Sequence, residues 1–582
     1  MKLIIAVLFL ISITLHASNI TFISSNATQA GKFVHLLKTA KENNVSMNTY
    51  FIEELPHDSD EQIFLKSDIV VFDILKDHNY IEESIRKKIP KAINFLEAKH
   101  LPVLWLNRQH DYKSNLDEKI QQKLYEYYTN GGSSNNTNFF KAIRNIKSSE
   151  IINSLPKPII YPESGIYHPK AKDTVFENVE DYLKFIQYNI KDQKPVIAIA
   201  FTQQYLISQQ TALIDDFITE IEKNNAIALA FYCKTKNPKA IRNMVTLNGK
   251  NLANVLINNQ AMFNSEGRKK EFESLKIPVL QALYYRKGDE KTWKNDSHGI
   301  DFTTIPYYLA QQEYAGVTDI QIAAAINKDD DQIVSIKPQL QALVQKAFNL
   351  VKLQTMENKD KKISLFFYNY PPGEKNLTAS FLNVPKSLEK TLKVLKEKGY
   401  TLDTYEQKKL IALMQNLLSP FYRQNTIQKL QEENLVALLP LKTYLLWLDT
   451  LPIEVKNELN KHENVYDNPM LIQKNGEYNF AIPRLQIGNL SILPQPPKDI
   501  SYTDDAKEKE KKLYHNTKHP PSHHYFATYL WATKNNADAL IHYGTHGTQE
   551  WLSGKERGLS VFDYPMLAVG IFLLFIPISL II

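Results

Sequence analysis

Two histidines and a glutamate recur at four-residue intervals late in the chain, at His542, His546 and Glu550. Imidazole nitrogens and a carboxylate suit a borderline divalent metal ion, and this spacing would align them on one helix face. Gly544 and Gly547 favour a loop instead, so the residue types support a metal site more strongly than the expected geometry does. The same groups can accept protons from a bound substrate. The alternative is a loop held by ordinary hydrogen bonds.

An apolar run directly precedes this loop. Leu540, Ile541 and Tyr543 predict a short buried strand that ends at Gly544. Functional groups in α/β proteins commonly follow the C-terminal ends of strands. We therefore expect the loop to lie at the carboxyl edge of a sheet, with His542 and Glu550 lining a cleft between domains.

The rest of the chain alternates strand-like and helical stretches. This rhythm predicts a multidomain α/β fold with mostly parallel sheets and crossover helices. Strands are expected at residues 20–23, 69–72, 101–106, 195–201, 227–232 and 363–367, and helices at 30–43, 80–98, 210–224 and 387–399. The polar segment 130–137 predicts a flexible surface loop. The expected divisions are a signal peptide (1–17), an N-terminal α/β domain (18–190), a middle α/β domain (191–355), a third domain with the histidine loop (356–565) and an apolar tail (566–582).

The N-terminus has the layout of a secretory signal peptide. Lys2 precedes an apolar run over residues 3–15, and the small residue Ala17 follows. We expect export, with a periplasmic mature protein. The alternative is an uncleaved membrane anchor, although the run is short for a span of about 20 residues.

Composition narrows the function classes. Cys233 is the single cysteine of 582 residues, so neither an internal disulfide nor a thiolate metal cluster can form. The net charge is +6, and no basic stripe with interleaved aromatic residues suggests nucleic-acid binding. No Walker-type glycine loop occurs, so we expect no ATP site of that kind in this chain.

Four ordered motifs carry a family resemblance. The segment His542 to Leu552, followed by Gly554 and Lys555, resembles the signature of the large subunit of cobalt and magnesium chelatases, the CobN/BchH family. The earlier motifs are FYNYPPG (367–373) with LNVP (382–385), GN (488–489) with PQPP (494–497), and PPSHHY (520–525). One departure is Ser553, where the family usually has proline.

The resemblance implies a ligase that forms nitrogen–metal bonds in a corrinoid or porphyrin ring. It implies a tetrapyrrole and a divalent metal (Co²⁺, Mg²⁺ or Fe²⁺) as substrates, with Glu550 and His546 as catalytic residues and His542, His546 and Glu550 as metal contacts. The implied tetrapyrrole contacts are His523, His524, Tyr525, Trp551 and Lys555. Two alternatives stay open: hydrogen bonding at a helix N-terminus for the adjacent histidines, and ordinary core packing for the aromatic residues.

The compartment conflicts with the family chemistry. The resemblance to cobaltochelatases implies an ATP-driven assembly in which a separate motor subunit supplies the energy. ATP is absent outside the cytoplasm, so an exported chain could not use it. An exported chain would instead release iron from haem without ATP, or only bind a tetrapyrrole or metal.

The C-terminal tail has two interpretations. Residues 566–582 carry no charge and could associate with the inner membrane, although seventeen residues are at the lower limit for a span. However, the family usually continues after Gly570 with a sequence like NIPIVYPYIVDNI. In suitably chosen codons, deletion of one nucleotide converts that continuation into the observed Ile571 to Ile582 and a stop codon. The tail is then a frameshift product, and the chain a truncated, weak or inactive part of a larger protein.

Overall fold

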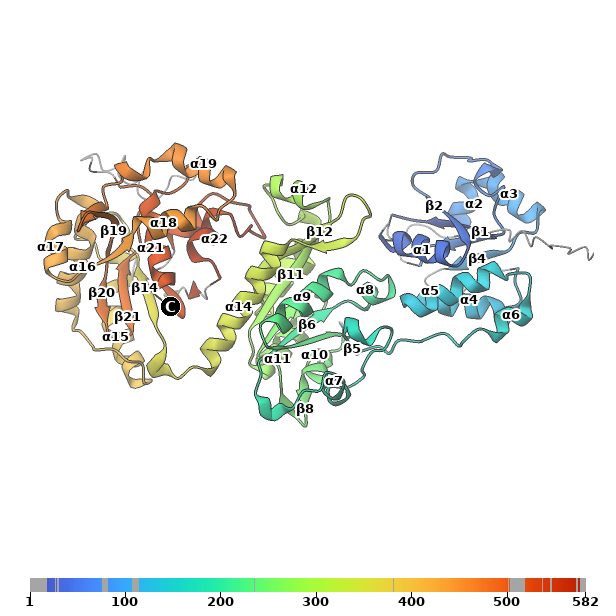
Figure 1. Cartoon of the computed structure of the whole chain (residues 1–582), viewed down its shortest axis with the longest axis horizontal. Coiled ribbons are helices and arrows are strands. Elements are labelled where there is room, and N and C mark those ends of the chain that lie inside the picture. The colour runs from blue at the N-terminus through green and yellow to red at the C-terminus, as the bar shows by residue number, and fades with distance from the viewer. Residues whose placement is uncertain are drawn as a thin grey trace, which may run out of the picture.

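Three α/β units follow one another along the long axis of the molecule (Figure 1). The computed structural model describes residues 18–26, 28, 31–75, 82–106, 115–234, 236–379, 382–500, 502, 519–535, 537–544, 547–571 and 574–575. The expected signal peptide, residues 1–17, lies outside the described residues, as do 572–573 and 576–582 of the apolar tail. Within the described ranges, no helix combines the length and the apolar character needed to cross a bilayer.

The first unit has four parallel strands in the order β2-β1-β3-β4. Ile20 and Phe22 belong to one buried apolar cluster and Ile23 to another, because successive side chains of a strand point to opposite faces. Burial on both faces explains the continuous apolar run of β3, whereas β2, at the edge of the sheet, is more polar and partly exposed. The elements are β1 (Ser18–Ser24), α1 (Gly31–Glu42), β2 (Val45–Phe51), β3 (Ile69–Asp73), α2 (Glu82–Lys88), α3 (Pro90–Ala98), β4 (Val103–Leu106), α4 (Glu118–Asn130), α5 (Gly132–Arg144) and α6 (Ser149–Ser154).

The predicted flexible loop at residues 130–137 is wrong. The segment is the junction of α4 and α5, with a turn at Gly131 (φ 57°) and Gly132 (φ 78°). The amide of Ser134 donates to the Asp173 carboxylate at 3.0 Å, and Asn135 exchanges two hydrogen bonds with the backbone of Ile159. The polar residues that suggested a loop therefore make tertiary hydrogen bonds at the start of a helix.

The second unit has a seven-stranded sheet in the order β13-β12-β11-β10-β6-β7-β5. Its five inner strands are parallel, and the edge strands β5 and β13 run antiparallel to their neighbours. Among the parallel strands, β6 comes first in the chain; β7 is then added on one side of it, and β10, β11 and β12 on the other. β5 precedes the expected boundary at 190/191, yet it pairs with β7 of this second sheet.

The elements of the second unit include a long final helix, α14, which leads into the third unit (Figure 1). They are β5 (Gly165–Tyr167), α7 (Val179–Phe185), β6 (Val196–Phe201), α8 (Gln203–Ile207), α9 (Ala212–Lys223), β7 (Ile227–Tyr232), α10 (Ala240–Val245), β8 (Thr246–Leu247), β9 (Lys250–Asn251), β10 (Val255–Asn258), α11 (Ser265–Leu275), β11 (Val279–Tyr285), α12 (Glu290–Asn295), α13 (Gln311–Tyr314), β12 (Thr318–Ile326), β13 (Ile333–Ser335) and α14 (Lys337–Thr355).

The third unit has a five-stranded sheet in the order β20-β21-β14-β22-β23, in which only β20 runs antiparallel to its neighbour. A smaller antiparallel sheet, β17-β19-β18, accompanies it. The elements are β14 (Ile363–Phe367), β15 (Thr378–Ala379), β16 (Leu382–Asn383), α15 (Val384–Glu397), α16 (Gln407–Tyr422), α17 (Ile427–Glu432), β17 (Val436–Pro440), α18 (Leu441–Leu448), α19 (Ile453–His462), β18 (Leu471–Lys474), β19 (Glu477–Pro483), β20 (Leu485–Ile487), β21 (Leu490–Pro494), α21 (His523–Lys534), β22 (Ala539–Tyr543), α22 (Tyr564–Val569) and β23 (Leu574–Phe575).

The start of the apolar tail packs inside the third unit. Ala568 and Val569 of α22 belong to its buried apolar cluster, and Leu574 and Phe575 pair in parallel with β22.

The three sheets together confirm the predicted multidomain α/β fold with mostly parallel strands.

Candidate functional site

The predicted loop follows β22 at the carboxyl edge of the third sheet. Phe367, the last residue of the central strand β14, pairs with Pro494 of β21 on one side and with Tyr543 of β22 on the other. Parallel pairing in this register places the segments after all three strands at one edge. Gln495 and Gly544 thus lie at the same end of the sheet.

A buried hydrogen-bond network surrounds His542. The Tyr529 hydroxyl lies 3.0 Å from Nε2 of His542, and the Gln495 amide nitrogen lies 3.4 Å from Nδ1. The same amide donates to Oε1 of Gln549 at 3.3 Å, and the Tyr525 hydroxyl lies 2.8 Å from the Thr548 hydroxyl. All these side chains are buried. The network connects α21, β21 and β22 to the loop and fixes the backbone around residues 547–549.

Burial determines the protonation of His542. Its side chain is 0% exposed, which lowers its pKa to about 3; a hydrogen bond with Gln549 opposes this shift. The imidazole is therefore neutral near pH 7 and is a poor proton acceptor. With both ring nitrogens in hydrogen-bond contact inside the unit, His542 positions the loop in this structure and does not line a cleft.

Gly547 permits the tight packing of the loop. A Cβ atom at this position would overlap Oε1 of Gln549 and lie 2.5 Å from Nδ1 of His542. Glycine is needed here because neighbouring side chains lie close to its Cα atom, not because of its backbone conformation, since its φ is −116°. The glycine of the motif therefore has a direct packing role.

Among the described residues of the loop, Glu550 and Trp551 are exposed. Both belong to a short 3₁₀ helix, Thr548–Trp551, and the Glu550 carboxylate accepts the amide of Gly547 at 3.1 Å. Trp551 as a whole residue is 37% exposed. His546 lies outside the described residues, so its predicted catalytic and metal-binding roles stay predictions.

The two adjacent histidines hold α21 in place. The His523 ring lies 2.7 Å from the Tyr444 hydroxyl and 3.0 Å from the carbonyl of Glu463, and His524 Nε2 lies 3.0 Å from the carbonyl of Ala481. Each histidine is 1% exposed, and burial lowers the pKa of His524 to about 4. Tyr525 is 0% exposed. The histidine rings thus bond to residues outside α21, whereas the side chain that caps its N-terminus is Ser522. The predicted tetrapyrrole contacts of His523, His524 and Tyr525 stay predictions.

Lys555 connects the motif segment to the second unit. Its ammonium donates to the carbonyls of Lys294 at 2.9 Å and Asp296 at 2.8 Å. The following residue, Glu556, donates its amide to the carbonyl of Ser297 at 2.8 Å. The predicted ligand contact of Lys555 stays a prediction, since its described partners belong to a contact between units.

Comparison with known proteins identifies the family. A family model described as CobN/Magnesium Chelatase matches residues 125–575, more than three quarters of the chain. The chain belongs to the CobN/magnesium chelatase family. The HYGTHGTQEW segment, the buried histidine helix and the network between them all lie within the matched region.

Individual proteins are similar to large parts of the chain. The chain is 28% identical to an uncharacterised protein of Methanocaldococcus jannaschii over 77% of this chain and 38% of that protein. It is 23% identical to a magnesium-chelatase subunit of Chlorobaculum parvum over 80% of this chain and 35% of that protein. Its fold is similar to that of the catalytic subunit of cobaltochelatase from Mycobacterium tuberculosis, with a TM-score of 0.72 and 18% identity, over 96% of this chain and 45% of that structure. The chain therefore spans less than half the length of these proteins.

The described part of this chelatase-family chain contains no group of three histidine, cysteine, aspartate or glutamate residues placed to hold a metal ion. Of the predicted metal trio, only His542 and Glu550 lie within the described residues. The expected contact between the metal and this trio thus stays a prediction that depends on His546.

The sequence did not predict two further residues, Gln495 and Lys498, as members of the site. Gln495 follows β21 and contacts both His542 and Gln549. Lys498 is 1% exposed, its ammonium donates to the carbonyl of Trp551 at 3.3 Å, and burial lowers its pKa to about 8. The available signal was their position in PQPPK, directly after a strand that pairs with β14.

Proposed function

We propose that this chain binds a tetrapyrrole and acts as the large subunit of a cobaltochelatase-type enzyme, in which a divalent metal is exchanged in a corrinoid or porphyrin ring. The observation that carries the proposal is the loop after β22. A buried network fixes its base, while Glu550 and Trp551 remain exposed at its end. Such an arrangement holds reactive groups in a defined position next to a ligand.

The chemistry assigns different roles to the polar residues of the loop. Metal insertion releases two pyrrole protons, and the exposed carboxylate of Glu550 is suited to accept them. The exposed indole of Trp551 offers a face for stacking on a conjugated ring. His542 positions the loop as a neutral imidazole, and His546 is the proposed second catalytic residue and metal contact.

Partner subunits supply the energy in this proposal. The chain has no Walker-type sequence, so a separate ATP-hydrolysing motor subunit would drive Co²⁺ or Mg²⁺ insertion. The tetrapyrrole and the metal are substrates, and the metal is the feature that distinguishes the cobalt and magnesium branches of the family.

Replacement of Glu550 by glutamine tests the catalytic role. We expect Glu550→Gln to bind deuteroporphyrin with an unchanged affinity and to insert Co²⁺ at least about 100-fold more slowly in the assembled chelatase. The matched control is Glu556→Gln, an exposed carboxylate six residues further along the chain. Insertion by Glu550→Gln at the rate of the unmodified protein would contradict the role of Glu550.

A second candidate function follows from the N-terminal sequence. Lys2, the apolar residues 3–15 and Ala17 support export, and an exported chain would release iron from haem without ATP. Mass spectrometry of the native protein should then find a mature N-terminus near Ser18 in the periplasmic fraction. Intact Met1 in the cytoplasmic fraction contradicts export. Iron release by purified protein that does not change in Glu550→Gln would indicate a binding protein without catalysis at this residue.

A further inference from the structure

A cavity of about 900 Å³ lies between the first and second units, far along the chain from the motif loop. Its walls include Thr202 after β6, Asn259 after β10 and Arg286 after β11, together with Phe51 and Glu54 of the first unit. The volume falls within the range of about 300–1,000 Å³ that small-molecule pockets occupy.

The position of this cavity in the sheet is that of a ligand site. Counted from β6, the five parallel strands have the order 2-1-3-4-5, so the chain changes direction across the sheet between β6 and β10. In open α/β sheets, ligands bind outside the carboxyl ends of the strands at such a switch point. Thr202 and Asn259 follow the two strands that flank it.

Arg286 supplies a cation at the cavity. Its guanidinium carbon lies 4.9 Å from the ring centres of both Tyr284 and Tyr308, and Nη2 donates to the Tyr308 hydroxyl at 2.6 Å. Among the residues that the structure describes, no carboxylate forms an ion pair with Arg286, whereas the neighbouring Lys287 pairs with Asp301 at 2.9 Å. The two tyrosines hold the guanidinium in place, and its other N–H groups remain for an anionic ligand.

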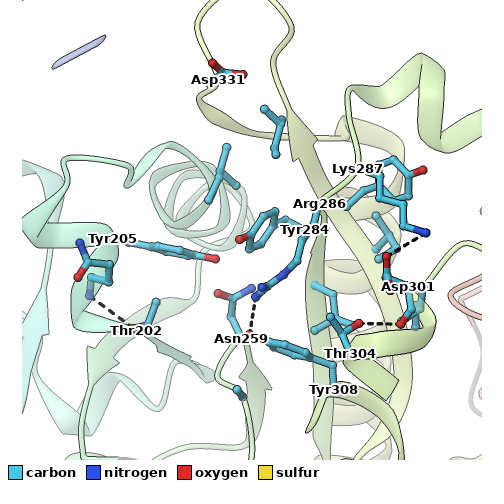
Figure 2. Close-up of a pocket in the computed structure, with 18 of the residues that line it drawn as sticks. Thr202, Tyr205, Asn259, Tyr284, Arg286, Lys287, Asp301, Thr304, Tyr308 and Asp331 are labelled. Atoms are coloured by element: carbon cyan, nitrogen blue, oxygen red, sulfur yellow. Dashed lines mark hydrogen bonds and ion pairs between the residues drawn. The ribbon is translucent and has the colours of Figure 1, made fainter. Parts of the chain in front are cut away.

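Asn259 and Tyr205 add a polar and an aromatic surface. The Asn259 side chain is 6% exposed, and its Oδ1 atom has no hydrogen-bond partner in the described part of the chain, while Nδ2 donates to the carbonyl of Ala282 at 2.7 Å. Tyr205 and Tyr284 direct their hydroxyl groups toward each other, close to Arg286 and Asn259 (Figure 2). A buried acceptor without a partner costs about 1–3 kcal/mol, so a ligand donor at this position would be favoured.

We propose that this cavity binds a planar conjugated ring that carries a carboxylate or phosphate group. Arg286 pairs with the anion, the tyrosine rings contact the ring system, and Oδ1 of Asn259 accepts an N–H or O–H of the ligand. This ligand site is separate from Glu550, so it extends beyond the proposed metal insertion and does not depend on it.

Titration calorimetry of the full chain with two pairs of probes tests the proposal. The pairs are flavin mononucleotide with riboflavin, and anthracene-2-carboxylate with its methyl ester; the second member of each pair lacks the anion, and none is a tetrapyrrole. We expect at least one anionic probe to bind at least about tenfold more tightly than its uncharged partner, because the charge-assisted bond to Arg286 is lost in the latter. Tighter binding of flavin mononucleotide than of riboflavin assigns a phosphate ligand, and tighter binding of the anthracene carboxylate than of its ester assigns a carboxylate ligand.

Variants then locate the binding. Arg286→Ala should weaken binding of the anionic probe at least about tenfold. Arg286→Lys should retain part of the affinity, because lysine keeps the positive charge but lacks the paired N–H donors of the guanidinium. Arg423→Ala, which removes an exposed arginine of the third unit, should leave the affinity for the anionic probe unchanged. The proposal is overturned if neither anionic probe binds, or if each uncharged partner binds as tightly as its anionic probe. It is also overturned if Arg286→Ala binds the anionic probe with the affinity of the unmodified protein.

Discussion

Acidification should destabilise the third unit through His542, and His542→Gln should remove that part of the effect. The folded-state pKa of His542 is about 3, below the value of about 6.5 for an unfolded histidine. As the pH falls below the unfolded value, the unfolded chain gains a proton that the folded chain excludes, so the free energy of unfolding decreases until the folded pKa is reached. Between pH 7 and pH 5 this linkage amounts to about 2 kcal/mol.

His524 contributes in the same direction, since burial lowers its pKa to about 4. The two histidines together should lower the free energy of unfolding of the unmodified protein by about 4 kcal/mol between pH 7 and pH 5, and His542→Gln should remove about 2 kcal/mol of that loss. His462 provides a control of opposite sign. Its pKa is raised by the hydrogen bond to Asp499, so its contribution to stability is present at low pH and is lost as the pH rises through the folded pKa. His462→Gln should make the loss on acidification larger.

Urea unfolding monitored by tryptophan fluorescence measures these differences. Three of the five tryptophans, Trp447, Trp531 and Trp551, belong to the third unit. Replacing Trp105 and Trp293 by phenylalanine in every variant would confine the signal to that unit. Equal losses of stability on acidification in His542→Gln and in the unmodified protein would refute the assignment of His542 as a buried neutral residue.

Three further substitutions test the packing around the site. Tyr529→Phe should lower the free energy of unfolding of the third unit by about 1–3 kcal/mol in urea, because it leaves Nε2 of the buried His542 without its hydroxyl partner; no change would contradict the network. Gly299→Ala should loosen the contact between the second and third units and accelerate proteolysis there, because its Cβ would overlap the carbonyl of Arg557 at a φ of +70°. Gly316→Ala is the matched control, with φ +89° and no atom within 4 Å, and equal proteolysis of the two variants would refute the contact. Lys555→Met should also accelerate proteolysis between these units, because the carbonyls of Lys294 and Asp296 lose their ammonium donor; proteolysis at the unmodified rate would contradict this role.

Local sequence patterns predicted several elements well. The apolar runs at 227–232 and 363–367 are the strands β7 and β14 with the expected bounds, and the run ending at Tyr543 is β22. These predictions succeed because strands buried on both faces need continuous apolar residues, whatever their neighbours in the sheet. The polar run at 130–137 failed for the opposite reason, since its residues bond to Asp173 and Ile159, which lie far away in the sequence.

The sequence by itself determined the α/β class, the strand before the histidine loop and, through four ordered motifs, the chelatase family. Only the tertiary structure decided what the side chains of that loop do. Burial is a property of the surroundings, and it makes His542 a neutral positioning residue while Glu550 remains exposed. The cavity at Arg286 depended on the tertiary structure for the same physical reason. It exists because strand order places the ends of β6, β10 and β11 together, and strand order is set by long-range pairing that no local pattern encodes.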